Sequence, residues 1–97
     1  MLMLPLSASA YYTTVDASAY TSAEGGTLGC RGDVLQVGYV ASDDLPYGTV
    51  VYIGEQRFVV MDCFGGDYSG RLDIFMESES DALEFGRKEL EIYVEED

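Results

Sequence analysis

The chain has 97 residues, a formal net charge of −13 and no histidine. This length suits one domain with a modest core, and a hydrophobic share of 47% favours folding over disorder. The charge argues against binding to nucleic-acid phosphates or to anionic lipid, and no apolar run is long enough for a transmembrane helix. Without histidine, carboxylates are the leading candidates for acid/base chemistry.

The N-terminal residues 1–14 predict an apolar arm in front of a folded domain, which we place at residues 15–97. The triplet Ala8-Ser9-Ala10 resembles a signal-peptide cleavage site. The apolar stretch before it is short and lacks basic residues. Residues 1–14 are therefore either a signal-peptide remnant or an N-terminal arm.

Six segments have the apolar character or the alternation that is typical of β-strands. They are residues 15–21, 34–41, 49–53, 56–61, 72–76 and 89–94. Gly54-Glu55 suits a tight hairpin turn between the third and fourth segments. Ser78 and Asp81 fit the start of a short helix that would end at Gly86. The sequence therefore predicts a mainly β fold, a closed or nearly closed barrel of six strands with one short helix.

Aspartates interrupt or follow the apolar runs at Asp62, at Asp73, and at Asp43 or Asp44. Strand ends of a small barrel meet at one rim, so we expect these carboxylates to lie close together. Repulsion and desolvation would then raise the pKa of at least one of them. A carboxyl that stays protonated can act as a general acid, which glycosidic cleavage requires. The alternatives are aspartates that cap turns, or a calcium site; we predict no metal and no cofactor.

The two cysteines, Cys30 and Cys63, are too few for a disulfide scaffold or a metal site. They could pair in a secreted domain or both stay reduced. Their spacing does not decide between these states.

Several motifs follow one another in order along the chain. They are residues 17–21 (ASAYT), 38–43 (GYVASD), 45–53 (LPYGTVVYI), 60–62 (VMD), 70–75 (GRLDIF), 82–88 (ALEFGRK) and 92–94 (IYV). Together they resemble the 3D domain, a family named for three aspartates. That domain occurs in stationary-phase survival and resuscitation-factor-like cell-wall proteins, and at the C-terminus of MltA-type lytic transglycosylases.

The resemblance implies a double-psi β-barrel that acts on peptidoglycan glycan strands, outside the cell or at the cell wall. In the lytic members, one aspartate protonates the oxygen between MurNAc and GlcNAc. It then acts as base while the C6 hydroxyl of MurNAc closes a 1,6-anhydro ring. By position, Asp73 would be this acid/base, Asp62 its neighbour and Asp43 the first aspartate of the family name.

The chain departs from the family pattern around the glycine loop between Asp62 and Asp73. The segment after Asp43 is shorter than usual, so Asp44 competes for the first role. A lysine that is usual in the loop is replaced by Tyr68-Ser69. We expect substrate contacts from Tyr20, Thr21, Tyr47, Gly48, Thr49, Gly65, Gly66 and Tyr68, with Tyr47 and Tyr68 as the best candidates for stacking on a sugar.

The sequence thus predicts a minimal lytic transglycosylase domain. The alternative is a non-catalytic glycan-binding barrel, such as a cell-wall or phage structural module. A single chain of this size predicts a shallow cleft, or one that is shared with a second copy in a homodimer.

Overall fold

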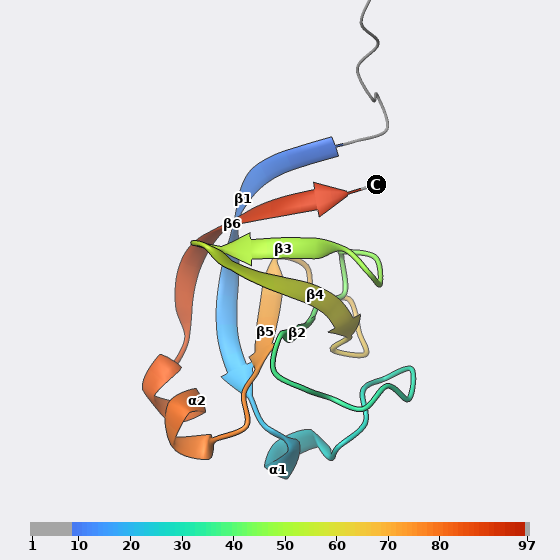
Figure 1. Ribbon diagram of the computed structural model, residues 1–97, viewed down its shortest axis with the longest axis vertical. Helices are drawn as coiled ribbons and strands as arrows, with labels where there is room; N and C mark the ends of the chain where they lie inside the picture. The colour runs from blue at the N-terminus through green and yellow to red at the C-terminus, as the bar shows by residue number, and fades with distance from the viewer. Residues whose placement is uncertain (1–8, 97) are drawn as a thin grey trace, which may run out of the picture.

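Six strands close into a barrel in the computed structural model, which describes residues 9–96 (Figure 1). The strands are β1 (Ser9–Tyr20), β2 (Tyr39–Ala41), β3 (Val50–Ile53), β4 (Gln56–Asp62), β5 (Arg71–Phe75) and β6 (Lys88–Glu96). The helices are α1 (Ser22–Gly25), a single turn, and α2 (Glu79–Phe85). The prediction of a mainly β fold with a six-stranded barrel is confirmed.

Around the barrel the strands follow the order β1-β5-β2-β4-β3-β6, and β6 closes on β1. Two neighbouring pairs are parallel, β1 with β5 and β2 with β4. The other four contacts are antiparallel. Parallel partners come from distant parts of the chain, so closing the barrel brings strand ends together that are far apart in sequence.

The strand β1 begins earlier than the sequence predicts. Residues 9–14, which we assigned to the N-terminal arm, pair with β6 in an antiparallel ladder that starts at Ser9 and Glu96. In Figure 1 this ribbon extends beyond the barrel at the end opposite to α1 and α2. The rest of the predicted arm, residues 1–8, lies outside the described residues and includes Ala8 of the cleavage-like triplet.

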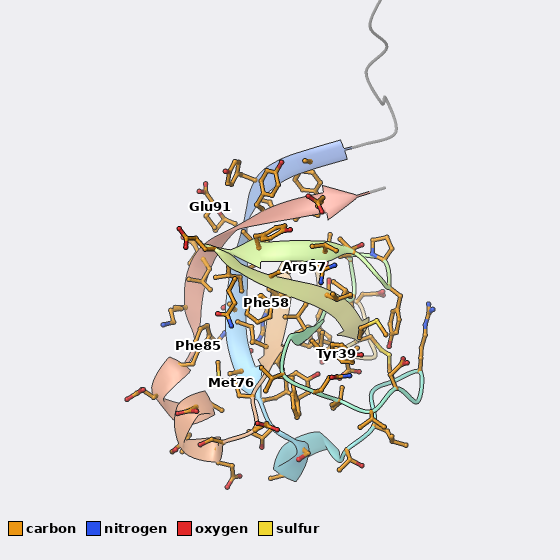
Figure 2. The ribbon with its side chains drawn as sticks, viewed as in Figure 1. Tyr39, Arg57, Phe58, Met76, Phe85 and Glu91 are labelled. Carbon is orange, nitrogen blue, oxygen red and sulfur yellow. A yellow bond between two sulfur atoms is a disulfide. The ribbon has the colours of Figure 1, made fainter. Side chains whose placement is uncertain are left out.

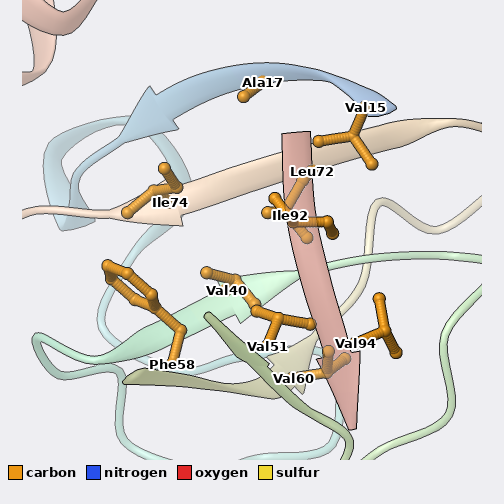
Figure 3. Close-up of a cluster of buried hydrophobic side chains, with 10 residues drawn as sticks. All are labelled: Val15, Ala17, Val40, Val51, Phe58, Val60, Leu72, Ile74, Ile92 and Val94. Atoms are coloured by element: carbon orange, nitrogen blue, oxygen red, sulfur yellow. The ribbon is translucent and has the colours of Figure 1, made fainter. Parts of the chain in front are cut away.

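The core is filled by one set of alternating side chains from all six strands, as period-2 strand geometry requires. Figure 3 shows how these side chains converge inside the barrel. The set comprises Val15, Ala17, Val40, Val51, Phe58, Val60, Leu72, Ile74, Ile92 and Val94. Residues between them on each strand consequently face outward, where they can meet a ligand.

The predicted turn and helix ends are confirmed. Gly54 adopts a φ of 62° in the hairpin between β3 and β4, a conformation that glycine takes without strain. The hydroxyl of Ser78 accepts a hydrogen bond from the amide of Asp81 at the start of α2. Gly86 ends the helix with a φ of 71°.

The second predicted strand, residues 34–41, was too long. Only its last three residues form β2, and Val34 instead makes an isolated bridge with Leu28. Residues 26–38 form a loop between α1 and β2 that lies over one side of the barrel (Figure 1). Among the described residues, no helix has the length and apolar character needed to cross a membrane.

Candidate functional site

Asp62 and Asp73 lie on either side of Ala41. Ala41 on β2 pairs with Asp62 on β4 and with Asp73 on β5. The register of β2 against β4 shifts between Val40 and Ala41, so Asp62 meets Ala41 and Asp73 although Val60, two residues earlier, fills the core. Both aspartates line one pocket of about 360 Å³, together with Tyr20, Leu28, Gly29, Cys30, Leu35, Ala41, Cys63 and Phe64. The structure thus brings together two of the three aspartates that we selected from the sequence.

The carboxylate of Asp62 is buried and accepts hydrogen bonds from three donors. The amides of Cys30 and Cys63 both donate to Oδ1 at 2.8 Å. The hydroxyl of Tyr20 donates to Oδ2 at 2.6 Å. Both oxygens are therefore engaged with the protein, which compensates for the burial of this carboxyl and fixes its position.

Tyr20 connects the two aspartates electrostatically. Desolvation, the hydrogen bond to Asp62 and the charges of Asp62 and Asp73 raise the pKa of Tyr20 far above its usual range. The ring packs edge-on against Phe75, with centroids 5.5 Å apart. Tyr20 therefore stays a neutral hydrogen-bond donor at any physiological pH.

A disulfide between Cys30 and Cys63 joins the loop of residues 26–38 to the end of β4. This settles the redox state that the sequence left open. The two sulfurs and the Asp62 carboxylate lie within 4.8 Å of one another, but the sulfurs are bonded to each other and offer no thiolate ligands. The disulfide thus positions the loop beside Asp62.

Gly29 allows the loop to approach β4 closely. A Cβ at this position would lie 3.1 Å from the carbonyl oxygen of Met61 and 3.2 Å from Oδ1 of Asp62. A side chain here would crowd Oδ1 of Asp62 and the carbonyl of Met61, which would have to shift by a few tenths of an ångström. The close approach allows the neighbouring amide of Cys30 to reach Asp62.

Asp73 is half-buried on the outer face of β5, because its neighbours Leu72 and Ile74 fill the core. The hydroxyl of Ser18 donates to Oδ1 of Asp73 at 3.0 Å. Nη2 of Arg71 in turn donates to Oγ of Ser18 at 2.8 Å. This arrangement directs the serine proton toward Asp73 and links the carboxylate to a guanidinium.

Asp43 and Asp44 both hold the glycine loop. The carboxylate of Asp43 accepts hydrogen bonds from the loop amides of Phe64, Gly65, Gly66 and Tyr68 at 2.8–3.3 Å. Desolvation raises the pKa of Asp43, but the four hydrogen bonds lower it by more, so the pKa lies below its usual range. Asp44 accepts from the amide of Gly70 at 2.9 Å. Asp43 and Asp44 therefore hold the glycine loop beside the pocket, whereas Asp62 and Asp73 line the pocket itself.

The other predicted contacts fall into two groups. Thr21 and Thr49 are buried, and the amide of Gly48 donates to the carbonyl of Val60, so these three belong to the framework. Tyr47 contacts the Cys30 sulfur through its hydroxyl at 2.8 Å. Tyr68 is 53% exposed, which leaves its ring available to a ligand.

Sequence reasoning missed Ser18, Arg71 and Phe64. Ser18 pairs in register with Asp73, and Arg71 is two residues before Asp73 on the same face of β5. The ring of Phe64 lies 5.5 Å from that of Tyr68 and 5.3 Å from the Arg71 guanidinium. The alternation of side chains along β5 could have placed Arg71 beside Asp73. Ser18 could be identified only once the pairing of β1 with β5 was known.

No protein-family model matches the sequence, and no curated protein matches it.

Proposed function

We propose that this chain is a peptidoglycan lytic transglycosylase domain. It would cleave the bond between MurNAc and GlcNAc and leave a 1,6-anhydro ring on MurNAc. The observation that carries the proposal is the pair Asp62 and Asp73 in one pocket beside Tyr20. The ordered motifs of the sequence support it, since they resemble a family with this activity.

We further propose that the barrel is of the double-psi type. Its two parallel pairs, β1 with β5 and β2 with β4, lie within an otherwise antiparallel closed barrel of six strands. This arrangement supports the assignment, as do the positions of Asp62 at the end of β4 and of Asp73 within β5.

In the proposed reaction, Asp73 acts first as an acid and then as a base. Its carboxyl gives a proton to the bridge oxygen as the bond from C1 of MurNAc to that oxygen breaks. The C6 hydroxyl then bonds to C1 and returns its proton to Asp73. No water is consumed, and the aspartate ends in its initial state.

Other residues in and beside the pocket would orient Asp73 and the sugar. Asp62 is held by three donors and suits positioning better than proton transfer. Ser18 fixes the direction of the Asp73 carboxyl through its hydrogen bond to Oδ1. Phe64 lines the pocket, and Tyr68 beside it offers an exposed ring for stacking.

The proposed location is outside the cell or at the cell wall. The disulfide between Cys30 and Cys63 supports it, because disulfides persist mainly in oxidising compartments. The charge of −13 fits a neutral region of the polymer, held by hydrogen bonds and stacking rather than by ion pairs.

The test is incubation of the protein with purified peptidoglycan, followed by mass spectrometry of the soluble products. We expect anhydro-muropeptides from the unmodified chain and from Asp67→Asn, a change in the exposed loop. Asp73→Asn should abolish them while the circular dichroism spectrum stays unchanged. Reducing ends in place of anhydro ends, or an active Asp73→Asn variant, would refute the proposal.

The second candidate is glycan binding without cleavage. The exposed Tyr68, packed on Phe64 at the edge of the pocket, favours it. Co-sedimentation with insoluble peptidoglycan distinguishes the two functions. Retention without soluble products, reduced by Tyr68→Ala but not by Asp73→Asn, would identify a binding module.

A further inference from the structure

Three tyrosines form a row across the outer face of β1, β6 and β3. Tyr93 on β6 pairs in register with Tyr12 on β1 and with Tyr52 on β3. The ring centroids of Tyr12 and Tyr93 are 4.9 Å apart, and those of Tyr52 and Tyr93 are 6.2 Å apart. Ile92 and Val94 fill the core on either side of Tyr93, so strand alternation places this row outside the barrel.

Two carboxylates flank the row along β6. Glu91 and Glu95 are each two residues from Tyr93, so they project from the same face, about 7 Å away along the strand in each direction. Both are exposed, and Figure 2 shows Glu91 on the outer side of the barrel. Among residues 9–96 the ion pairs are those of Asp16 with Arg71 and Arg87, so neither glutamate is neutralised by a basic side chain.

The tyrosines and the two glutamates line a pocket of about 600 Å³, which we name the tyrosine pocket. Its lining residues are Tyr12, Tyr52, Gly54, Glu91, Tyr93 and Glu95. None of them lines the pocket of Asp62 and Asp73. The tyrosine pocket is therefore a separate site, and its Tyr12 lies toward the start of β1, whereas Tyr20 of the other pocket is at the end of β1.

The chemistry of this lining selects a cation. Aromatic faces attract an ammonium group through the ring quadrupole, and carboxylates at the rim complement its charge. A sugar would need a flat platform, but the ring planes of Tyr12 and Tyr52 are tilted by 59° and 54° from that of Tyr93. The net charge of −13 further favours the approach of a cation.

The guanidinium of Arg57, on the neighbouring strand β4, does not take the place of a bound cation, since Arg57 does not line the tyrosine pocket. Arg57 on β4 pairs with Tyr52, but from the side of Tyr52 that faces away from Tyr93. The described cation–ring contacts of this protein involve Tyr47, Phe64 and Phe85, and none of these rings lines the tyrosine pocket.

We propose that the tyrosine pocket binds the side-chain ammonium group of a basic peptide. The ammonium group lies over the tyrosine rings, between the carboxylates of Glu91 and Glu95. This site does not depend on the proposed glycan cleavage, since it shares no residue with that pocket.

The experiment is a titration of the isotope-labelled full chain with a trilysine peptide whose ends are blocked, followed by NMR. We expect the largest shifts at the backbone amides of Tyr12, Tyr52, Glu91 and Tyr93. The double variant Glu91→Gln/Glu95→Gln should weaken binding by about tenfold, and Tyr52→Leu by about threefold.

The matched control is Glu79→Gln/Glu84→Gln, which removes the same charge from the exposed surface of α2. It should weaken binding by less than about twofold at physiological salt. Equal weakening by both double variants would overturn the proposal, because the peptide would then follow net charge alone. No binding at millimolar peptide, equal binding of a peptide with acetylated lysines, or the same shifts with a neutral chitin oligosaccharide would also overturn it.

Discussion

The hydroxyl of Tyr20 donates a 2.6 Å hydrogen bond to Oδ2 of Asp62, across 42 residues of sequence. It joins the end of β1 to the end of β4, which are not neighbours in the barrel. This contact holds Oδ2 of the buried carboxylate, whereas the amides of Cys30 and Cys63 hold Oδ1.

Tyr20→Phe should destabilise the fold by about 1 to 3 kcal/mol, because it leaves one oxygen of a buried carboxylate without its donor. Urea unfolding followed by circular dichroism measures the change. Tyr68→Phe is the control, since the Tyr68 side chain is 53% exposed, and should change the free energy of unfolding by less than about 0.5 kcal/mol. Equal effects of the two variants would mean that the Tyr20 hydroxyl contributes little.

Tyr20 should also make the protein sensitive to alkali. Its pKa is raised in the folded state, so the folded chain keeps the proton when the unfolded chain loses it near pH 10. The associated stability is fully present below about pH 10 and is lost as pH rises further. Between about pH 10 and 11.5, unfolding midpoints should therefore fall more steeply for the unmodified chain than for Tyr20→Phe. Parallel curves would contradict the raised pKa.

Asp43→Asn should loosen the glycine loop. The amide oxygen is a weaker acceptor than the carboxylate for the four loop N–H groups, so hydrogen exchange at Phe64, Gly65, Gly66 and Tyr68 should accelerate by about tenfold. Asp67→Asn, in the same loop, is the control and should leave these rates nearly unchanged.

The Asp43 carboxylate should also make the stability of the glycine loop depend on pH in the acid range. The pKa of Asp43 is lowered on folding, so its contribution to stability is present above the unfolded value near 3.8 and is lost as pH falls through the folded value. Loop exchange, corrected for intrinsic rates, should therefore accelerate below about pH 4 in the unmodified chain but not in Asp43→Asn.

Removal of the disulfide should cost about 3 to 4 kcal/mol, since Cys30 and Cys63 are 33 residues apart and the open chain gains the corresponding entropy. The variant Cys30→Ser/Cys63→Ser tests this by urea unfolding. Dithiothreitol should lower the stability of the unmodified chain to a similar degree and should not affect the variant. An unfolding curve of the unmodified chain that is insensitive to dithiothreitol would contradict a structural disulfide.

Ser18→Ala should reduce the proposed glycan cleavage on the order of tenfold to a hundredfold, because Asp73 loses the donor that orients it. The release of anhydro-muropeptides over time measures the rate, and the unfolding midpoint confirms that the fold persists. Ser69→Ala, in the exposed loop, is the matched control and should retain full activity. Full activity of Ser18→Ala would show that this hydrogen bond is not used in the reaction.

The sequence by itself determined which segments form strands, because each carries a local signal. Alternation, the glycine of the hairpin and the Ser78 cap depend on neighbours within a few residues, and these elements formed where predicted. Two boundaries failed for the same reason. Residues 9–14 join β1 because β6 offers a partner ladder. The ladders of β2 begin only at Tyr39, and Val34 instead bridges Leu28.

The candidate site divides in the same way. Asp62 and Asp73 could be found from sequence because a charge within an apolar run is conspicuous wherever the chain folds. The pairing of both with Ala41, the donors from Tyr20 and Cys30, and the link from Arg71 through Ser18 depend on contacts across β1, β2, β4 and β5. Such contacts are set by barrel closure and strand register, which no short stretch of sequence can predict. The tyrosine row depends on the same register, since Tyr12, Tyr52 and Tyr93 meet only when β3 and β1 pair with opposite edges of β6.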